Sequence, residues 1–360
     1  KRIMAYTTIN KSTDHFNTKL YTGNGSTQSI TGVGFQPDWV WFKIRNTTGD
    51  NRVFDVVRGA EARLYTNGAQ AEASPDTGTL TSFDSDGFSV GNSDVNINGS
   101  SQVSWNWKAG NSSGSSNSDG SITSTVSANT TAGYSIVKWT GDGTKAATVG
   151  HGLGVKPSWI IARDYAQTKH WFVYHKELTD NYVMTLNSTE EQKTGNSYWG
   201  SGSLMKSASS PTTTTFSFNG SGSSITNING NSYTNIAYCF AEKVGYSKFG
   251  KYTGNGNTDG TFVYTGFKPA FVIIKNRTAV ESWYTLDNQR PGYNTNNYYI
   301  LPNTNGAEGT STSLATSLLS NGFKIDNSDT SMNTSGNIYI YMAFAEAPLV
   351  GTNNIPATAK

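Results

Sequence analysis

The chain has 360 residues, of which 35% are hydrophobic and only 14% are charged, and its formal net charge is +2. Its polarity comes from Gly, Ser, Thr and Asn, while aromatic residues make up 12% of the sequence. This composition differs from that of disordered chains, which are highly charged and poor in aromatics, and it lacks the Lys and Arg runs that bind nucleic acid. Because Ser, Asn and Gly disfavour helix interiors and Thr and aromatic residues suit strands, we expect an all-β protein.

The pentapeptide YTGNG at residues 21–25 is typical of a turn at the end of a strand. It returns as WTGDG at 139–143 and as YTGNG at 252–256. Three such turns, at nearly equal intervals along the chain, indicate that one unit is used three times.

A strand is predicted directly after Pro37, in the sequence GFQPDWVWFKIRN. Alternation places Trp39 and Trp41 on one face and Val40 and Phe42 on the other. A strand that is apolar on both faces is buried on both. The proline before it starts the strand without breaking a hydrogen-bond ladder.

Similar apolar runs follow Pro157 and Pro269, and the spacing of these prolines is close to that of the repeated turns. The basic residues Lys43, Arg163 and Lys275 occur within these runs, where we expect the strand to reach solvent.

Two further sets of residues align in the three segments. The first set keeps the spacing of the prolines and consists of Asp55, His175 and Asp287. The second set lies in the apolar strand that closes each segment and is predicted to be in the core. It consists of Trp107, Phe240 and Phe344.

Turn signals at the spacing typical of sandwiches and barrels favour three tandem homologous antiparallel β-sandwich domains, jelly-roll-like in form. No segment has a clear helical period, so we expect helix in less than about a tenth of the residues. The expected boundaries are 1–110 for the first sandwich, 111–124 for a Ser/Gly-rich linker, 125–245 for the second sandwich, 246–350 for the third and 351–360 for a C-terminal tail.

The two junctions between units differ in sequence. The first, NSSGSSNSDGS, has the composition of a flexible linker, whereas the second, AEKVGYSKFGKYTG, has almost no spare residues. We therefore expect the second and third units to pack tightly and the first to be held more loosely.

The single cysteine, Cys239, lies in the apolar run IAYCFAEK and is expected to be a buried hydrophobic side chain. A chain without an internal disulfide fits assembly in a reducing cytoplasm. The sequence also has no apolar stretch of the length that would predict a membrane span.

Residues with catalytic potential are few. The position of Asp55 and Asp287 is taken by His175 in the middle segment, which argues against one catalytic acid shared by the three. His170 and His175 are separated by an odd number of positions, so on a strand they point to opposite faces and do not suit a zinc site. We expect a protein that is not an enzyme and that uses no cofactor and no metal.

Two loops combine aromatic rings with amide side chains, in the sequences KTGNSYWGSGS and PGYNTNNYYILPN. An aromatic ring can stack on a sugar while neighbouring amides bond its hydroxyl groups, so these loops are candidates for glycan binding. The alternative is that the rings pack the loops or a subunit contact. The candidate residues are Tyr198, Trp199, Tyr293, Tyr298 and Tyr299.

Several stretches resemble one known family, among them MAYTTINKSTDHFNTKLYTGNG, GHGLGVKP and the ending IYMAFAEAPLVGTNNIPATAK. Nearly the whole chain is similar to repeat-built structural proteins of marine bacteriophages. Members of that family are assigned to the virion as tail-fibre, host-recognition or surface-decorating proteins. The resemblance implies a virion protein that is assembled in the host cytoplasm, and it carries over no catalytic residues.

Two classes of function remain open. The first is a tail-fibre or host-recognition adhesin that binds a cell-surface glycan. The second is a capsid-decorating, tube or filament protein with no ligand beyond its own neighbours. A depolymerase is disfavoured because no shared pair of acids is found. In either class we expect a homo-oligomer that contacts other virion proteins, binds no nucleic acid and does not insert into a membrane.

Overall fold

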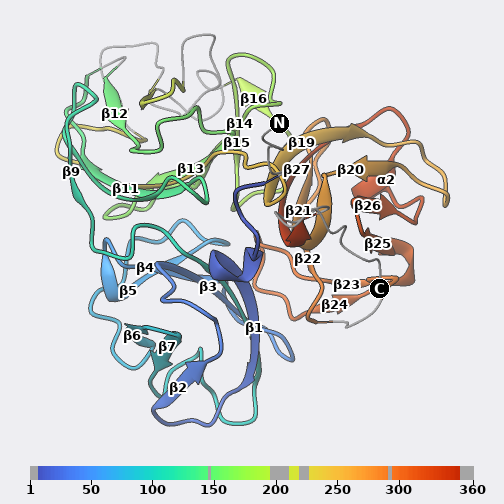
Figure 1. Ribbon diagram of the computed structural model, residues 1–360, viewed down its shortest axis with the longest axis horizontal. Coiled ribbons are helices and arrows are strands. Elements are labelled where there is room, and N and C mark those ends of the chain that lie inside the picture. The colour runs from blue at the N-terminus through green and yellow to red at the C-terminus, as the bar shows by residue number, and fades with distance from the viewer. Residues whose placement is uncertain (1–6, 145–146, 195–210, 219–226, 291–293, 349–360) are drawn as a thin grey trace, which may run out of the picture.

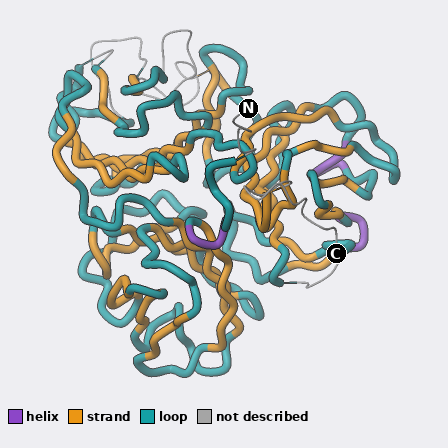
Figure 2. Tube along the Cα trace, in the orientation of Figure 1, coloured by secondary structure: helices purple, strands orange, loops and turns teal. Residues whose placement is uncertain are grey.

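The computed structural model describes residues 7–144, 147–194, 211–218, 227–290 and 294–348 (Figure 1). Strands make up 45% and helices 3% of the structure, and its sheets are antiparallel, with none closed in the described ranges. The expected all-β class and the low helix content are therefore confirmed. Figure 2 shows short helices among the strands and loops, namely η1 (Ser12–Asp14), η2 (Thr312–Leu314) and α2 (Thr330–Asn333).

The described chain forms three lobes around a common centre (Figure 1). We call residues 7–110 the first lobe, 111–245 the second lobe and 246–348 the third lobe. Each lobe contains one large sheet. In each sheet the last strand of the lobe lies between a strand near the start of the lobe and the strand that follows Pro37, Pro157 or Pro269. The strand order around these three strands is thus the same in every lobe.

The large sheets have the following order and bounds. In the first lobe it is β1 (Phe16–Thr22), β8 (Ser101–Trp107), β3 (Trp39–Ile44), β4 (Arg52–Asp55) and β5 (Gly59–Tyr65). In the second it is β16 (Lys193–Thr194), β15 (Tyr182–Thr185), β14 (Phe172–His175), β13 (Trp159–Asp164), β18 (Thr234–Phe240), β11 (Tyr134–Thr140), β10 (Ser124–Asn129) and β9 (Ser115–Asn117). In the third it is β19 (Ser247–Thr253), β27 (Ile338–Pro348), β21 (Phe267–Asn276) and β22 (Trp283–Asp287).

A smaller sheet packs on one face of each large sheet. The first lobe has β2 (Gln28–Thr31), β7 (Gly87–Val90) and β6 (Leu80–Asp84). The second has β12 (Thr148–Gly150) and β17 (Thr215–Ser217), and the third has β20 (Phe262–Tyr264), β26 (Gly322–Ile325) and β25 (Thr316–Leu319). A further pair in the third lobe joins β23 (Tyr298–Tyr299) to β24 (Gly309–Thr310).

The strand after each proline is buried on both faces, as its sequence predicted. In the first lobe, Trp39 and Trp41 lie in a core that all three lobes share. Val40 and Phe42 lie in a second core, between the large and the small sheet of that lobe. Cys239 is fully buried in the corresponding core of the second lobe, which confirms its prediction as a buried hydrophobic side chain.

The shared core centres on Trp107, Phe240 and Phe344, one residue from each lobe. The ring centroid of Trp107 lies 6.4 Å from that of Phe240 and 5.8 Å from that of Phe344, and the centroids of Phe240 and Phe344 are 5.9 Å apart. The prediction that they are core residues is confirmed, because each is 1% exposed. Each also lies across the strand ladder from the residue two positions after one of the three prolines. These cross-strand pairs are Trp39 with Trp107, Trp159 with Phe240 and Phe271 with Phe344.

The expectation that Lys43, Arg163 and Lys275 reach solvent is wrong, since all three are 0% exposed. The neighbouring lobe covers this end of the strand in two cases. Arg163 donates to the carbonyl oxygen of Ala69 in the first lobe at 3.0 Å, and Lys275 donates to that of Thr189 in the second lobe at 3.0 Å. Burial lowers the pKa of Lys275 to about 7.

The Ser/Gly-rich junction suggested that the first lobe is held loosely, but the first lobe is packed against the other two. Within that junction, residues 115–117 form β9 at the edge of the second lobe's sheet. The first lobe also reaches the third through an ion pair between Arg45 and Glu308, with 2.9 Å between Nη2 and Oε1. The composition of a junction reports only on the junction, whereas the apolar faces of the sheets decide how the lobes pack.

Asp38 precedes β3 and ties it to the chain leaving the first lobe. Its Oδ2 accepts the backbone N–H groups of Ala109 and Asn111 at 2.7 and 2.8 Å. Burial raises the pKa of this carboxyl to about 6, and the two hydrogen bonds only partly oppose the rise. Because the folded-state pKa exceeds the ordinary value of 3.8, the neutral carboxyl stabilises the fold. This contribution is fully present below about pH 4 and is lost as the pH rises to about 6.

We expect Asp38→Asn to remove this pH dependence, since the amide oxygen can still accept both N–H groups. Between pH 4 and 7 the free energy of unfolding of the wild type should fall by roughly 2–3 kcal/mol relative to the variant. Urea unfolding at a series of pH values measures this difference. Asp14→Asn, at a half-exposed position, is the control, and a difference that stays constant with pH for Asp38→Asn would contradict the prediction.

Candidate functional site

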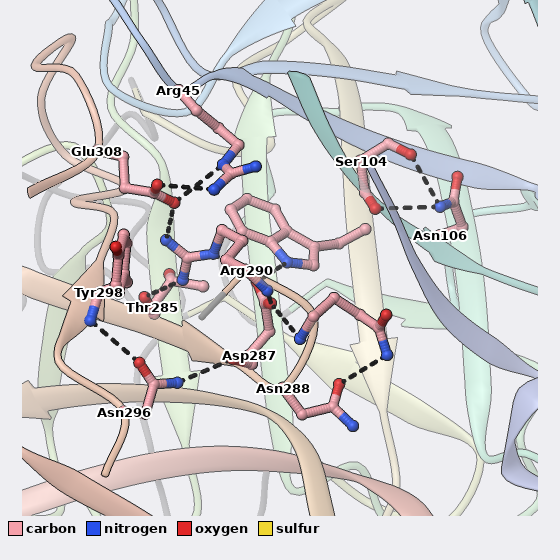
Figure 3. Close-up of polar contacts among 12 residues, drawn as sticks. Arg45, Ser104, Asn106, Thr285, Asp287, Asn288, Arg290, Asn296, Tyr298 and Glu308 are labelled. Atoms are coloured by element: carbon pink, nitrogen blue, oxygen red, sulfur yellow. Dashed lines mark hydrogen bonds and ion pairs between the residues drawn. The ribbon is translucent and has the colours of Figure 1, made fainter. Parts of the chain in front are cut away.

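Charged side chains form a chain of contacts where the third lobe meets the first. Figure 3 shows Arg290 between Asp287 and Glu308, with its Nε 2.7 Å from Asp287 Oδ2 and its Nη1 3.0 Å from Glu308 Oε2. The first lobe contributes Arg45, which pairs with Glu308. It also contributes Trp105, whose Nε1 donates to Asp287 Oδ2 at 3.0 Å.

Local backbone geometry positions these acids. Asp287 ends β22, and its Oδ1 accepts the N–H groups of Gln289 and Arg290, each at 3.0 Å. Asp55 ends β4 in the same manner and accepts the N–H group of Arg58 at 2.9 Å. An Asp that bonds the backbone two and three residues ahead forms a tight turn, and this turn brings the arginine back beside its carboxylate.

The same arrangement lies where the first lobe meets the second. Arg58 Nε is 2.6 Å from Asp55 Oδ2, and Arg58 Nη1 is 2.7 Å from Glu72 Oε2. The second lobe contributes Tyr238, whose hydroxyl donates to Asp55 Oδ2 at 2.8 Å. Burial opposes the charge of Arg58, but Asp55, Tyr238 and Glu72 outweigh it and raise the pKa of the guanidinium. The guanidinium of Arg58 is therefore held in its charged form.

The contact between the second and third lobes replaces these charges with a histidine and a leucine. His175 Nδ1 accepts the N–H group of Glu177 at 3.0 Å, so Nε2 carries the proton that faces the carbonyl oxygen of Tyr341, 3.3 Å away. Leu178 stands where the other lobes have arginine, and it is buried in the shared core. Met342 occupies the position of the donors Trp105 and Tyr238, and a thioether has no proton to donate to an acid at this place.

A backbone hydrogen bond recurs at all three contacts and closes the ring of lobes. The first lobe donates to the second, the second to the third and the third to the first. The bonds are Glu72 N–H to Tyr165 O at 2.7 Å, Gln192 N–H to Arg277 O at 3.0 Å and Glu308 N–H to Arg45 O at 2.8 Å. The donor residue is glutamate at two of these contacts, Glu72 and Glu308. At the contact where leucine replaces arginine, it is the neutral Gln192.

These charged groups are arranged for packing. The side chains of Asp287 and Arg290 are both 0% exposed, and each carboxylate oxygen is already bonded to donors. A general acid or base must reach the proton that it transfers, and the side chains of Asp287 and Arg290 are closed to solvent. The alignment of Asp55, His175 and Asp287 in the sequence therefore marks the lobe contacts.

The predicted glycan-binding residues are only partly covered by the described ranges. Tyr198, Trp199 and Tyr293 lie outside them. Tyr298 is half-buried in β23, and its N–H group donates to Asn296 Oδ1 at 3.1 Å (Figure 3). Tyr299 packs on Tyr284, with ring centroids 5.6 Å apart, and adjoins the core of the third lobe. The ring of Tyr299 thus contributes to packing, as the alternative interpretation of this loop had it.

The surface of the third lobe carries an open, polar hollow with a volume of about 530 Å³. Hydroxyl, amide and carboxylate side chains line it, among them Thr258, Ser313, Asp326 and Asp329. Among the described residues, no group of three or more His, Cys, Asp or Glu side chains is placed to hold a metal ion. In the same ranges no helix has the length and apolar character needed to span a membrane.

Two exposed aromatic residues near this hollow were not singled out from the sequence. Phe262 is 45% exposed and Tyr264 is 51% exposed, both on β20. Between them Val263 is buried, so the alternation of β20 turns its aromatic side chains outward and its aliphatic one inward. Because all three residues are apolar, the sequence does not tell which face of β20 is buried, and it gave no signal for the outward-facing pair.

A family model described as a domain of unknown function, DUF7483, matches residues 11–348. The chain belongs to the DUF7483 family. The match runs through all three lobes of the DUF7483 chain, so the family is defined by the whole ring and not by one lobe. No curated protein and no solved structure matches it.

Proposed function

We propose that this DUF7483 chain is a non-catalytic component of a bacteriophage virion, a tail-fibre or host-recognition protein that binds a cell-surface glycan. The resemblance to marine phage structural proteins supports the setting. The observation that carries the non-catalytic role is the use of the buried acids: Asp55 and Asp287 are bonded to arginine and to donors of the adjacent lobe. A neutral, polar surface on a rigid ring suits the binding of a neutral ligand.

We also propose that the three lobes are tandem homologous β-sandwiches. The similar spacing of Pro37, Pro157 and Pro269 along the chain supports this. The common strand order and the recurring contacts between lobes support it as well. On this proposal the chain is an internal trimer of one unit, in which each contact is heterologous and the ring closes.

A purely structural role, as a capsid-decorating, tube or filament protein, is the second candidate. The closed ring favours it, because a body whose lobes share one core resists deformation. The expectation of a homo-oligomer rested on the need of polar units for lateral contacts. The ring supplies such contacts within one chain, so self-association would serve assembly of the virion and not the stability of the units.

Immunogold labelling of purified virions with an antibody against the chain separates the two roles. Label at the distal tips of fibres is expected for the adhesin, whereas label along a shell or tube supports the structural role. Virions that carry no label would overturn both.

Adsorption of the fluorescently labelled full chain to host cells tests glycan binding. Binding should be saturable and should fall when periodate oxidises the vicinal diols of the cell surface. Cells treated with protease, which spares glycans, are the control. Adsorption that survives periodate and is lost with protease would show that the receptor is a protein.

A further inference from the structure

The outer face of the small sheet β20–β26–β25 carries an aromatic pair. Phe262 pairs with Lys324 across the ladder and Tyr264 pairs with Gly322. Because side chains alternate along a strand, Phe262 and Tyr264 share the face opposite to the buried Val263. Gly322 has no side chain, and the ring of Phe262 reaches the space above it, beside Tyr264.

The small sheets of the other lobes carry small side chains at the matching positions. In each lobe an inward-facing aliphatic residue pairs with a buried phenylalanine, which fixes the match between the sheets. Phe262 and Tyr264 are 45% and 51% exposed, and the exposed half of an aromatic side chain contributes nothing to the fold by burial. The pair in the third lobe therefore calls for another reason. The matching residues are Ser29 and Thr31 in the first lobe and Thr148 and Gly150 in the second.

Polar groups adjoin the aromatic pair. Lys324 lies directly across from Phe262, and its Nζ is 2.6 Å from Asp259 Oδ1 and 3.2 Å from Asp326 Oδ1. Asp326 also lines the polar hollow of about 530 Å³. The aromatic pair and the hollow are thus linked through Lys324 and form one continuous surface, which we call the β20 surface.

We propose that the β20 surface binds a neutral glycan, with Phe262 and Tyr264 stacking on the apolar face of a sugar ring. The side chains of the hollow, Asp326 and Ser313 among them, then bond its hydroxyl groups. This inference rests on the proposed glycan-binding function and assigns it to residues other than the candidates predicted from the sequence.

The size and charge of the β20 surface favour a sugar over other ligands. Two half-exposed aromatic side chains offer roughly 200 Å², whereas a stable protein interface buries about 800 Å² on each partner. An anionic ligand is disfavoured because the ammonium of Lys324 is already paired with two carboxylates and Asp329 adds a further negative charge nearby. A neutral ring with one apolar face and several hydroxyl groups fits both the area and the polar hollow.

The decisive variant is Phe262→Ser combined with Tyr264→Thr, which installs the residues of the first lobe at the same positions. The probes are neutral gluco-, galacto- and manno-oligosaccharides of six sugars, together with neutral polysaccharide released from host envelopes. Saturation-transfer NMR on the full chain should show binding of at least one probe, and the variant should weaken it roughly tenfold or more. Val280→Ser, which alters a 58% exposed side chain elsewhere in the third lobe, should leave it unchanged.

Three outcomes would overturn the inference. If the double variant binds the glycan as well as the wild type, the β20 surface is not the site, although the proposed function stands. If no neutral probe binds, while the chain still adsorbs to host cells and periodate treatment of the cells abolishes that adsorption, the ligand is a glycan of another class. If sizing shows a dimer that the double variant dissolves, the surface seats a second copy. By contrast, a wild-type chain that does not adsorb to any host cells would count against the proposed function itself.

Discussion

Replacing Trp107 by Ala is expected to destabilise all three lobes together, by about 3–5 kcal/mol, the range for removing a large buried aromatic. Trp107 is 1% exposed and contacts Phe240 of the second lobe and Phe344 of the third. Its removal leaves a cavity where side chains of all three lobes meet. The loss of packing therefore acts on every lobe and not on the first alone.

Hydrogen exchange followed by mass spectrometry can distinguish a shared loss from a local one. In Trp107→Ala, protection should fall in β8, β18 and β27, the closing strands of the three lobes. The matched control is Phe88→Ala, since Phe88 is equally buried but belongs to the core of the first lobe alone. Its effect should stay within that lobe. Protection that is lost only in the first lobe of Trp107→Ala would show that the three cores are independent.

Replacing Arg290 by Leu is expected to lower the free energy of unfolding by about 3–5 kcal/mol, because it leaves Asp287 as a buried charge without its cation. Trp105 still donates one hydrogen bond to Asp287, but a neutral donor does not compensate a charge. Glu308 keeps its ion pair with Arg45, so the larger part of the loss comes from Asp287.

The contact between the second and third lobes shows how this cost can be removed. It uses a neutral set at the same positions: His175, Leu178 and Gln192. We expect the triple change Asp287→His, Arg290→Leu and Glu308→Gln to recover part of the stability lost in Arg290→Leu, since no buried carboxylate then remains at these positions. The recovery is partial because Trp105, where the other contact has Met342, keeps an indole N–H group that loses its acceptor.

Urea unfolding of the wild type, Arg290→Leu and the triple variant measures this recovery. Lys11→Leu, which removes an exposed ion pair, is the control and should change stability little. A triple variant less stable than Arg290→Leu would mean that the lobe contacts are not interchangeable, and it would weaken the proposal that the lobes are homologous.

The candidate site could be predicted only in part. The regular spacing in the sequence found the position of Asp55, His175 and Asp287, but it indicated only that the three do not share a catalytic acid. Their partners, Tyr238 and Trp105, belong to other lobes and lie far away along the chain. No local pattern reports such a pairing, because it depends on which lobe lies beside which. The outward-facing Phe262 and Tyr264 were likewise missed, since exposed aromatics resemble core residues in a sequence.

The sequence by itself determined the strand class, the strand after each proline, the burial of both its faces and the register that brings Trp107, Phe240 and Phe344 to matching places. The strand class and the buried strands follow from short apolar runs between polar turns, which are a local property of the chain. The register follows from the regular spacing of those runs along the sequence. Only the tertiary structure decided what covers the second face. The three large sheets bury it against one another, and for that reason Arg163 and Lys275 end beneath a neighbouring lobe and not in water.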